Sequence, residues 1–169
     1  MIKLDENLKM THYTSYDLIE WAKPFEKRKN PLPIPKGSEV LIRVTAAGLC
    51  HSDLHVQKGY MDLGNEGRLT FAERGAELPM TFGHEIAGGV ENTGADANSF
   101  KKGQQVLVFP WIGCGECAAC KEERESDCAS MRIIGLKQKG GFATHLSLIH
   151  ISEPTRLLSI AYAVLCLKK

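Results

Sequence analysis

Four cysteines lie close together in the second half of the chain, at Cys114, Cys117, Cys120 and Cys128. Two cysteines separated by two residues can turn both sulfurs toward one point, and four thiolates satisfy the tetrahedral preference of Zn²⁺. Such a site has no open position for a substrate or water, so it stabilises structure and performs no chemistry. We therefore predict a structural zinc site. Disulfides or unrelated free thiols are the alternative, but nothing in the sequence indicates the oxidising compartment that disulfides need.

Two other segments contain residues that could form a reactive metal site. Cys50 and His84 are of types that bind Zn²⁺. With three protein ligands, a zinc ion keeps a fourth position for an alcohol oxygen and lowers its pKa, which prepares the alcohol to release hydride. That chemistry also needs a carboxylate to orient the histidine, a hydroxyl to relay the proton and a base to pass it to water. Residues of these types follow Cys50 at Asp53, Ser52 and His55.

The elements that must position these residues are predicted to be mainly β-strands. In residues 39–47, Val40 and Ile42 alternate with Leu41 and Arg43, the pattern of a half-buried strand that ends just before Cys50. Further strands are predicted at residues 15–21, 86–90, 105–109, 131–136 and 141–148. Several short strands joined by glycine and proline turns indicate an all-β barrel or sandwich.

Two stretches between the predicted strands have other patterns. Four prolines between residues 24 and 35 exclude regular helix and favour an extended path. Residues 59–79 are rich in glycine and charge, so we predict a long surface loop with one helical turn at residues 69–74.

Bulk composition limits the classes of protein to which the chain can belong. Its 169 residues have room for one ordinary domain, with 43% hydrophobic residues, a mean hydropathy of -0.18 and a formal net charge of +1. This balance gives no argument for binding nucleic acid or a membrane surface. No stretch has the length of a membrane span, and the polar first ten residues do not resemble a signal peptide. We therefore predict a cytoplasmic protein.

Three motifs, in the same order, resemble the zinc-dependent alcohol dehydrogenases of the medium-chain dehydrogenase/reductase superfamily. The spacing Cys-x2-Cys-x2-Cys-x7-Cys is similar to that family's structural-zinc lobe. Gly48-Leu-Cys-His-Ser-Asp-Leu-His55 is similar to its first catalytic-zinc segment, and Gly83-His-Glu-Ile-Ala-Gly88, followed by Gly94, is similar to its second. The resemblance covers roughly residues 15–146 and implies a GroES-like, partly open β-barrel with a zinc lobe at residues 111–130.

The resemblance also implies a role for each residue of the two catalytic segments. Cys50 and His84 match two ligands of a catalytic zinc ion, and Glu85 matches a glutamate beside the metal that can exchange with bound water. Asp53 matches the carboxylate that orients the histidine ligand. The remaining matches are Ser52 and His55 with the proton relay, and His51 with a contact to the cofactor pyrophosphate.

The sequence departs from the family in three places. In the family, a third zinc ligand, cysteine or aspartate, lies well beyond the structural lobe, and the cofactor binds a Rossmann domain with a Gly-x-Gly-x-x-Gly turn. This sequence has no such turn, and Cys166 follows Cys128 too closely to be that ligand. Glu91-Asn-Thr93 stands where a mostly apolar strand is expected, which should weaken the strand. We interpret residues 147–169 as a non-family tail of translated adapter or vector sequence; a genuine apolar helix at residues 157–167 is the alternative. Residues 1–14 are predicted to be a loose tail.

Two hypotheses for function follow. The first is the N-terminal catalytic domain of an NAD(P)-linked alcohol dehydrogenase acting on a small alcohol or aldehyde, with one structural and one catalytic zinc ion, inactive alone and homo-oligomeric at full length. The second is a non-catalytic zinc-binding GroES-like module acting in binding or assembly. The retention of Ser52, Asp53, His55 and Glu85 argues against the second hypothesis, because a binding module has no use for a proton relay. Neither the alcohol nor the choice between NAD and NADP can be predicted.

Overall fold

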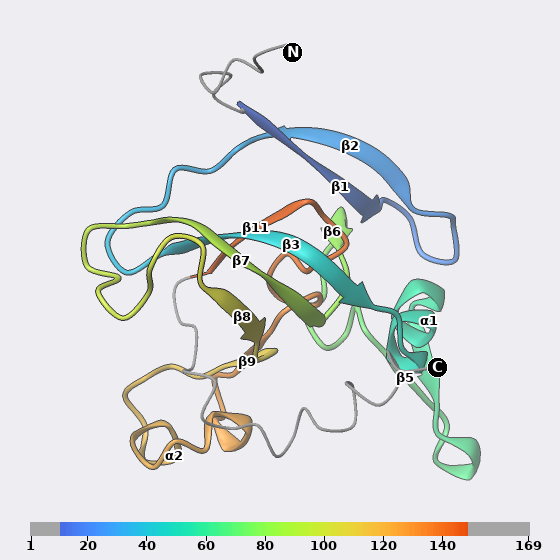
Figure 1. The fold of residues 1–169 in the computed structure, drawn as a ribbon. Helices are drawn as coiled ribbons and strands as arrows, with labels where there is room; N and C mark the ends of the chain where they lie inside the picture. The colour runs from blue at the N-terminus through green and yellow to red at the C-terminus, as the bar shows by residue number, and fades with distance from the viewer. Residues whose placement is uncertain (1–10, 149–169) are drawn as a thin grey trace, which may run out of the picture.

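The computed structural model describes residues 11–148. This part of the chain contains eleven strands, two α-helices and two 3₁₀ turns, so the predicted mainly β architecture is confirmed (Figure 1). In chain order the elements are β1 (His12–Leu18), β2 (Glu26–Pro31), β3 (Val40–Gly48), α1 (His51–Lys58), β4 (Tyr60–Asp62), η1 (Gly64–Glu66), β5 (Arg68–Thr70), β6 (Met80–Thr81), β7 (Glu85–Thr93), β8 (Gln105–Val108), β9 (Trp111–Ile112), α2 (Ala118–Lys121), η2 (Glu125–Asp127), β10 (Arg132–Ile133) and β11 (His145–Leu148). Cys166 and the predicted helix at 157–167 lie outside the described residues. Among the helices of residues 11–148, none has the length and apolar character of a membrane span.

The central sheet is antiparallel, with strand order β11-β3-β7-β8. Strands β3 and β7 are nine residues long and pair along their whole length, from Val40 opposite Thr93 to Gly48 opposite Glu85. Two register shifts interrupt the pairing, and the ribbon of both strands curves. Because β3 runs into Cys50 and β7 begins just after His84, this pairing brings the two catalytic-zinc segments to the same end of the sheet.

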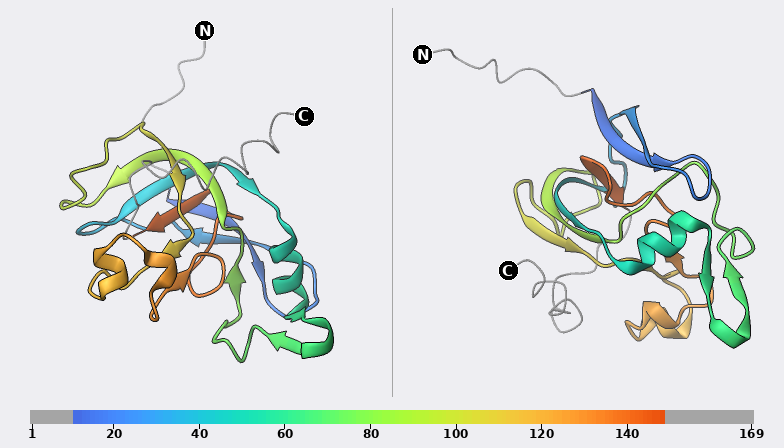
Figure 2. Two further views of the ribbon diagram at one scale, coloured as in Figure 1. Left: turned by 90° about the horizontal axis from the view of Figure 1, so that it is seen from below. Right: turned by 90° about the vertical axis from the view of Figure 1, so that its right-hand side faces the viewer.

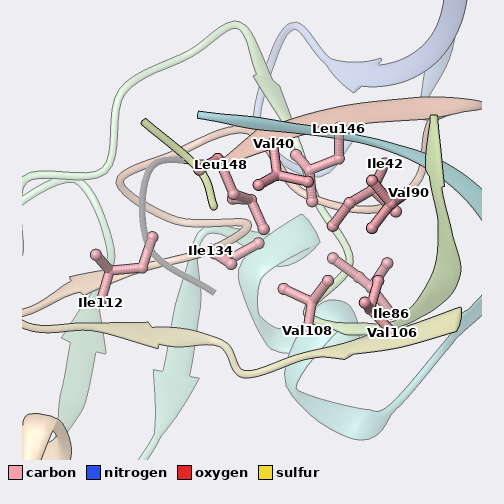
Figure 3. Packing of buried hydrophobic residues seen from close by; sticks show 11 residues of the cluster. Val40, Ile42, Ile86, Val90, Val106, Val108, Ile112, Ile134, Leu146 and Leu148 are labelled. Carbon is pink, nitrogen blue, oxygen red and sulfur yellow. The ribbon is translucent and has the colours of Figure 1, made fainter. Parts of the chain in front are cut away.

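The main hydrophobic core lies on one face of this sheet (Figure 3). The buried side chains come from four strands and from the segment around β9 and β10, and they point toward one another. Those labelled in Figure 3 are Val40, Ile42, Ile86, Val90, Val106, Val108, Ile112, Ile134, Leu146 and Leu148. Full burial of one such side chain contributes about 1.5–3 kcal/mol. This packing fixes the register of β3 against β7, since a shift by one residue would turn the apolar set outward.

A second core joins α1 to the hairpin of β1 and β2. Its buried residues include Leu18 from β1, Val56 from α1 and Phe82 from the segment before His84. Phe25 packs edge-on against Phe82, with ring centroids 5.5 Å apart, and against Phe142 at 5.9 Å. The helix that follows Cys50 is therefore fixed against the segment that carries His84. The two views in Figure 2 show α1 beside this hairpin.

Several predicted elements are wrong in their bounds or type. Strand β1 begins at His12, three residues before the predicted start, so residues 12–14 belong to a strand and not to a loose tail. Residues 59–79 contain the hairpin of β4 and β5, and residues 71–75 form a turn in place of the predicted helical turn. Leu41, placed with the polar face, is 3% exposed.

Polar residues extend β7 beyond its predicted end. β7 continues through these polar residues to Thr93, and its pairing with β3 shifts register at Glu91. Whether Glu91-Asn-Thr93 weakens the strand stays a prediction. The Glu91 carboxylate accepts hydrogen bonds from Arg43 at 2.8 and 3.1 Å and contacts His145 Nε2 at 3.0 Å. Side-chain hydrogen bonds across β3, β7 and β11 replace the apolar contacts that the sequence lacks at this end.

Candidate metal centres

Helix α1 positions the first catalytic-zinc segment. Cys50 immediately precedes the helix, and its backbone N–H donates to Asp53 Oδ2 at 3.0 Å. The helix ends at Gly59, whose φ of 89° is left-handed and whose N–H donates to the carbonyls of His55 and Val56. Sequence reasoning did not predict this helix. Asp53 at its third position and Gly59 at its end were the available signals.

The second segment places His84 between β6 and β7. Gly83 precedes it with a left-handed φ of 90°, and a Cβ there would lie 2.6 Å from Phe142 Cδ1. Only glycine therefore fits this position without displacing the Phe142 ring. The tight approach of Gly83 to Phe142 directs the chain so that His84 faces Cys50.

Three potential metal ligands converge at this end of the sheet. Cys50 Sγ lies 3.3 Å from His84 Nε2, and a carboxylate oxygen of Glu85 joins them in a group whose ligand atoms are all within 4.8 Å of one another. Zinc bonds of about 2.3 Å to sulfur and about 2.0–2.1 Å to nitrogen give a sulfur–nitrogen separation of about 3.6 Å at the tetrahedral angle. The observed separation fits a shared metal ion. The structure thus brings together the predicted Cys50, His84 and Glu85.

Asp53 lies at the Nδ1 side of the His84 ring, whereas the Cys50 sulfur lies at the Nε2 side. Asp53 is 3% exposed, and its Oδ1 is 3.5 Å from His84 Nδ1, which leaves Nε2 facing Cys50. Burial alone would raise the pKa of Asp53, but contacts with His84 and the Cys50 N–H outweigh it and lower that pKa. The contact with Asp53 in turn raises the pKa of His84, against the opposing effect of burial. A carboxylate on the far nitrogen is the usual arrangement for a metal-binding histidine.

The four clustered cysteines form a second group, in a lobe that contains β9, α2 and η2. Their sulfurs all lie within 4.8 Å of one another, and Cys114 Sγ is 3.9 Å from Cys120 Sγ. A tetrahedral zinc site with bonds of about 2.3 Å has sulfurs about 3.8 Å apart. All four are free thiols, so the disulfide alternative finds no support. Gly113 leaves space for the Cys120 sulfur, which a Cβ there would overlap.

Backbone amides stabilise negative charge in this lobe. Hydrogen bonds from the N–H groups of Glu116 and Cys117 lower the pKa of Cys114 to about 6. The Gly115 amide has the same effect on Cys120, but burial and the neighbouring sulfurs outweigh it and raise the pKa of Cys120 to about 12. The thiolate of Cys114 is therefore favoured, whereas the thiol of Cys120 ionises only with a cation among the sulfurs, which suits a metal site. The lobe lies on the opposite side of the molecule from α1 (Figures 1 and 2).

Residues 36–151 match the sequence profile of the family described as the alcohol dehydrogenase GroES-like domain, which is more than half of the chain. The chain belongs to this family. The match ends five residues beyond the predicted domain end at 146. The interpretation of residues 147–169 as a non-family tail stays a prediction.

Relatives of this GroES-like domain include NAD-dependent alcohol dehydrogenases. Those of Sulfurisphaera tokodaii and Saccharolobus solfataricus are 41% and 40% identical over 134 residues, which are 79% of this chain and 37% of each relative. The crystal structure of D-arabinose dehydrogenase from Sulfolobus solfataricus is 31% identical, with a TM-score of 0.67 over 83% of this chain and 38% of that chain. The chain spans little more than a third of the length of these proteins.

The remaining predicted site residues of the GroES-like domain all lie on α1. The rings of His51 and His55 stack in parallel, with centroids 4.6 Å apart. Ser52 is exposed, and within residues 11–148 no hydrogen bond joins it to either ring. The structure therefore places the three on the helix that follows Cys50 without linking them into a proton chain.

Proposed function

We propose that the segments around Cys50 and His84 form the catalytic metal site of a zinc-dependent, NAD(P)-linked alcohol dehydrogenase, which interconverts an alcohol and an aldehyde or ketone. The observation that carries this proposal is the approach of Cys50 Sγ to His84 Nε2 at 3.3 Å, with Asp53 behind the imidazole. The names of the NAD-dependent alcohol dehydrogenases that resemble this chain support the same reaction class.

Each residue of the site has a role in the proposal. Bound here, zinc would supply Lewis-acid chemistry by lowering the pKa of an alcohol hydroxyl. Cys50 and His84 would hold the ion with Glu85 beside it, and Asp53 would keep the imidazole oriented. The residues that would pass the proton to water are Ser52 and His55, and His51 would contact the pyrophosphate of NAD or NADP.

The four-cysteine lobe would hold a second zinc ion with a purely structural role, because thiolates occupy all four positions. Hydride transfer also needs a nicotinamide in reach, and the sequence contains no Gly-x-Gly-x-x-Gly turn. We therefore expect this chain by itself to be inactive. The cytoplasmic location and a homo-oligomeric full-length enzyme stay predictions.

A domain exchange tests the reaction class. Residues 11–148 would replace the matching region of the Sulfurisphaera tokodaii NAD-dependent alcohol dehydrogenase, and NAD⁺ reduction would be measured with a panel of primary and secondary alcohols. We expect zinc-dependent turnover that Cys50→Ala and His84→Ala abolish and that His12→Ala, outside both segments, leaves unchanged. A chimera that folds and binds both zinc ions but oxidises no alcohol would favour the non-catalytic zinc-binding module.

A further inference from the structure

Gly48 lies opposite Glu85 in the last residue pair between β3 and β7. A Cβ at Gly48 would overlap Glu85 Oε2 and lie 3.0 Å from Glu85 Cβ. Directly opposed residues in antiparallel strands ordinarily have Cβ atoms about 4.5–5.5 Å apart. The φ of Gly48 is not in the left-handed region, so its backbone conformation does not require glycine. The requirement for glycine at this position is one of space.

The Glu85 carboxylate occupies the space that a side chain at position 48 would fill. The Glu85 side chain is exposed, and no hydrogen bond from residues 11–148 holds its carboxylate. Its oxygen nevertheless lies within 4.8 Å of Cys50 Sγ and the His84 imidazole. The bare backbone of Gly48 is thus the feature that allows the carboxylate to lie toward the two other ligands.

We propose that Gly48 is a positioning residue for the metal site: its missing side chain places the Glu85 carboxylate beside Cys50 and His84. This inference rests on the metal site of the proposed function. A methyl group at position 48 would displace the carboxylate end of the flexible Glu85 side chain and would also lie 3.0 Å from Glu85 Cβ, a contact that a small shift relieves. The sheet can therefore remain folded while the carboxylate swings away from the other two ligands. The effect of substituting Gly48 on metal binding therefore passes through Glu85.

A double-mutant cycle tests this dependence. Gly48→Ala, Glu85→Ala and the double variant would be compared in Co²⁺ and Zn²⁺ affinity, measured by competition with a chromophoric chelator after the cysteine lobe has been filled. We expect each single variant to bind about 10–100-fold more weakly, as for other groups that orient a metal ligand. The double variant should bind no more weakly than Glu85→Ala. If the two losses multiply, Gly48 acts independently of Glu85 and the inference is wrong.

Three further variants complete the test. Gly89→Ala adds a methyl group to β7 near the flexible Gln105 side chain, and it should leave metal affinity unchanged. If Gly48→Ala does not fold, the exchange Gly48→Ala/Glu85→Gly removes the Cβ overlap, and it should bind as Glu85→Gly does; weaker binding would contradict the inference. A wild-type chain that binds no ion at Cys50 and His84 would refute both this inference and the proposed site, whereas multiplied losses refute the inference alone.

Discussion

Replacement of Asp53 by asparagine tests whether this carboxylate prepares His84 for metal binding. Asp53 is 3% exposed, accepts a hydrogen bond from the Cys50 N–H at 3.0 Å and lies 3.5 Å from His84 Nδ1. Asparagine has nearly the same size and retains an acceptor oxygen for the Cys50 N–H, so the start of α1 should persist. It removes the negative charge that faces the imidazole.

Two arguments give the size of the effect. Substitution of the group behind a metal-binding histidine lowers metal affinity about 10–100-fold, which corresponds to about 1.4–2.8 kcal/mol. A hydrogen bond to a charged group contributes about 1.5–3 kcal/mol. The 3.5 Å separation from His84 exceeds the usual hydrogen-bond range, which places this contact at the lower end. We therefore expect Asp53→Asn to weaken metal binding at Cys50 and His84 about tenfold.

The assay is a chelator competition titration at neutral pH with the cysteine lobe already filled, so that only the site at α1 is measured. Asp17→Asn is the matched control. Asp17 is also a buried carboxylate, 6% exposed, but it accepts a hydrogen bond from Thr81 Oγ1 at 2.6 Å and belongs to neither metal group. Wild-type affinity in Asp53→Asn, or an equal loss in Asp17→Asn, would refute the reasoning.

Three other substitutions test the fold and the lobe. Glu91→Gln removes a carboxylate whose pKa is lowered chiefly by the hydrogen bond from Arg43 and also by His145, against the effect of burial. Because the fold stabilises the ionised form, the contribution of Glu91 to the free energy of unfolding is present above pH 4.5 and is lost as the pH falls through the lowered pKa. Denaturant titrations of Glu91→Gln should therefore show a loss of about 1–2 kcal/mol in the free energy of unfolding at pH 7, and this loss should shrink in acid. A loss that stays constant with pH would contradict this assignment. Cys128→Ser should remove one zinc ion per chain by metal analysis and leave the other site's affinity unchanged; an unchanged zinc content would show that the lobe is not a metal site. Ile42→Ala, at a position that is 0% exposed, should cost about 2–5 kcal/mol in the same denaturant assay, and a cost below 1 kcal/mol would mean that the core tolerates the cavity.

The candidate ligands could be predicted from the sequence because their residue types and spacing restrict what they can do. Cysteines at intervals of three bring their sulfurs together through a local turn, so the lobe is encoded within one short segment. Helix α1 could not be predicted from periodicity, because its eight residues are mostly polar and only Asp53 and Val56 are buried. Its existence depends on the packing of Val56 against β1 and Phe82.

The polar end of β7 shows a second limit of the sequence pattern. Strand propensity depends on what lies beside each residue, and the partners of Glu91 are Arg43 on the neighbouring strand β3 and His145 on β11, one strand further along the sheet. Neither partner is close in sequence, so no local pattern indicates the network. His145 is 4% exposed and belongs to no motif, so its contact with Glu91 supports the sheet and not a metal site.

The two metal groups depend on the fold in different ways. Cys114 and Cys128 are 14 residues apart, and the lobe can close without the central sheet. Cys50 and His84 are 34 residues apart, and they meet only because β3 and β7 pair in one register up to Gly48 and Glu85. That register is fixed by the apolar side chains of the main hydrophobic core, none of which is a candidate ligand, since a one-residue slip would expose them. The hydrophobic core therefore determines the geometry of the candidate catalytic site, whereas the geometry of the lobe follows from its own sequence.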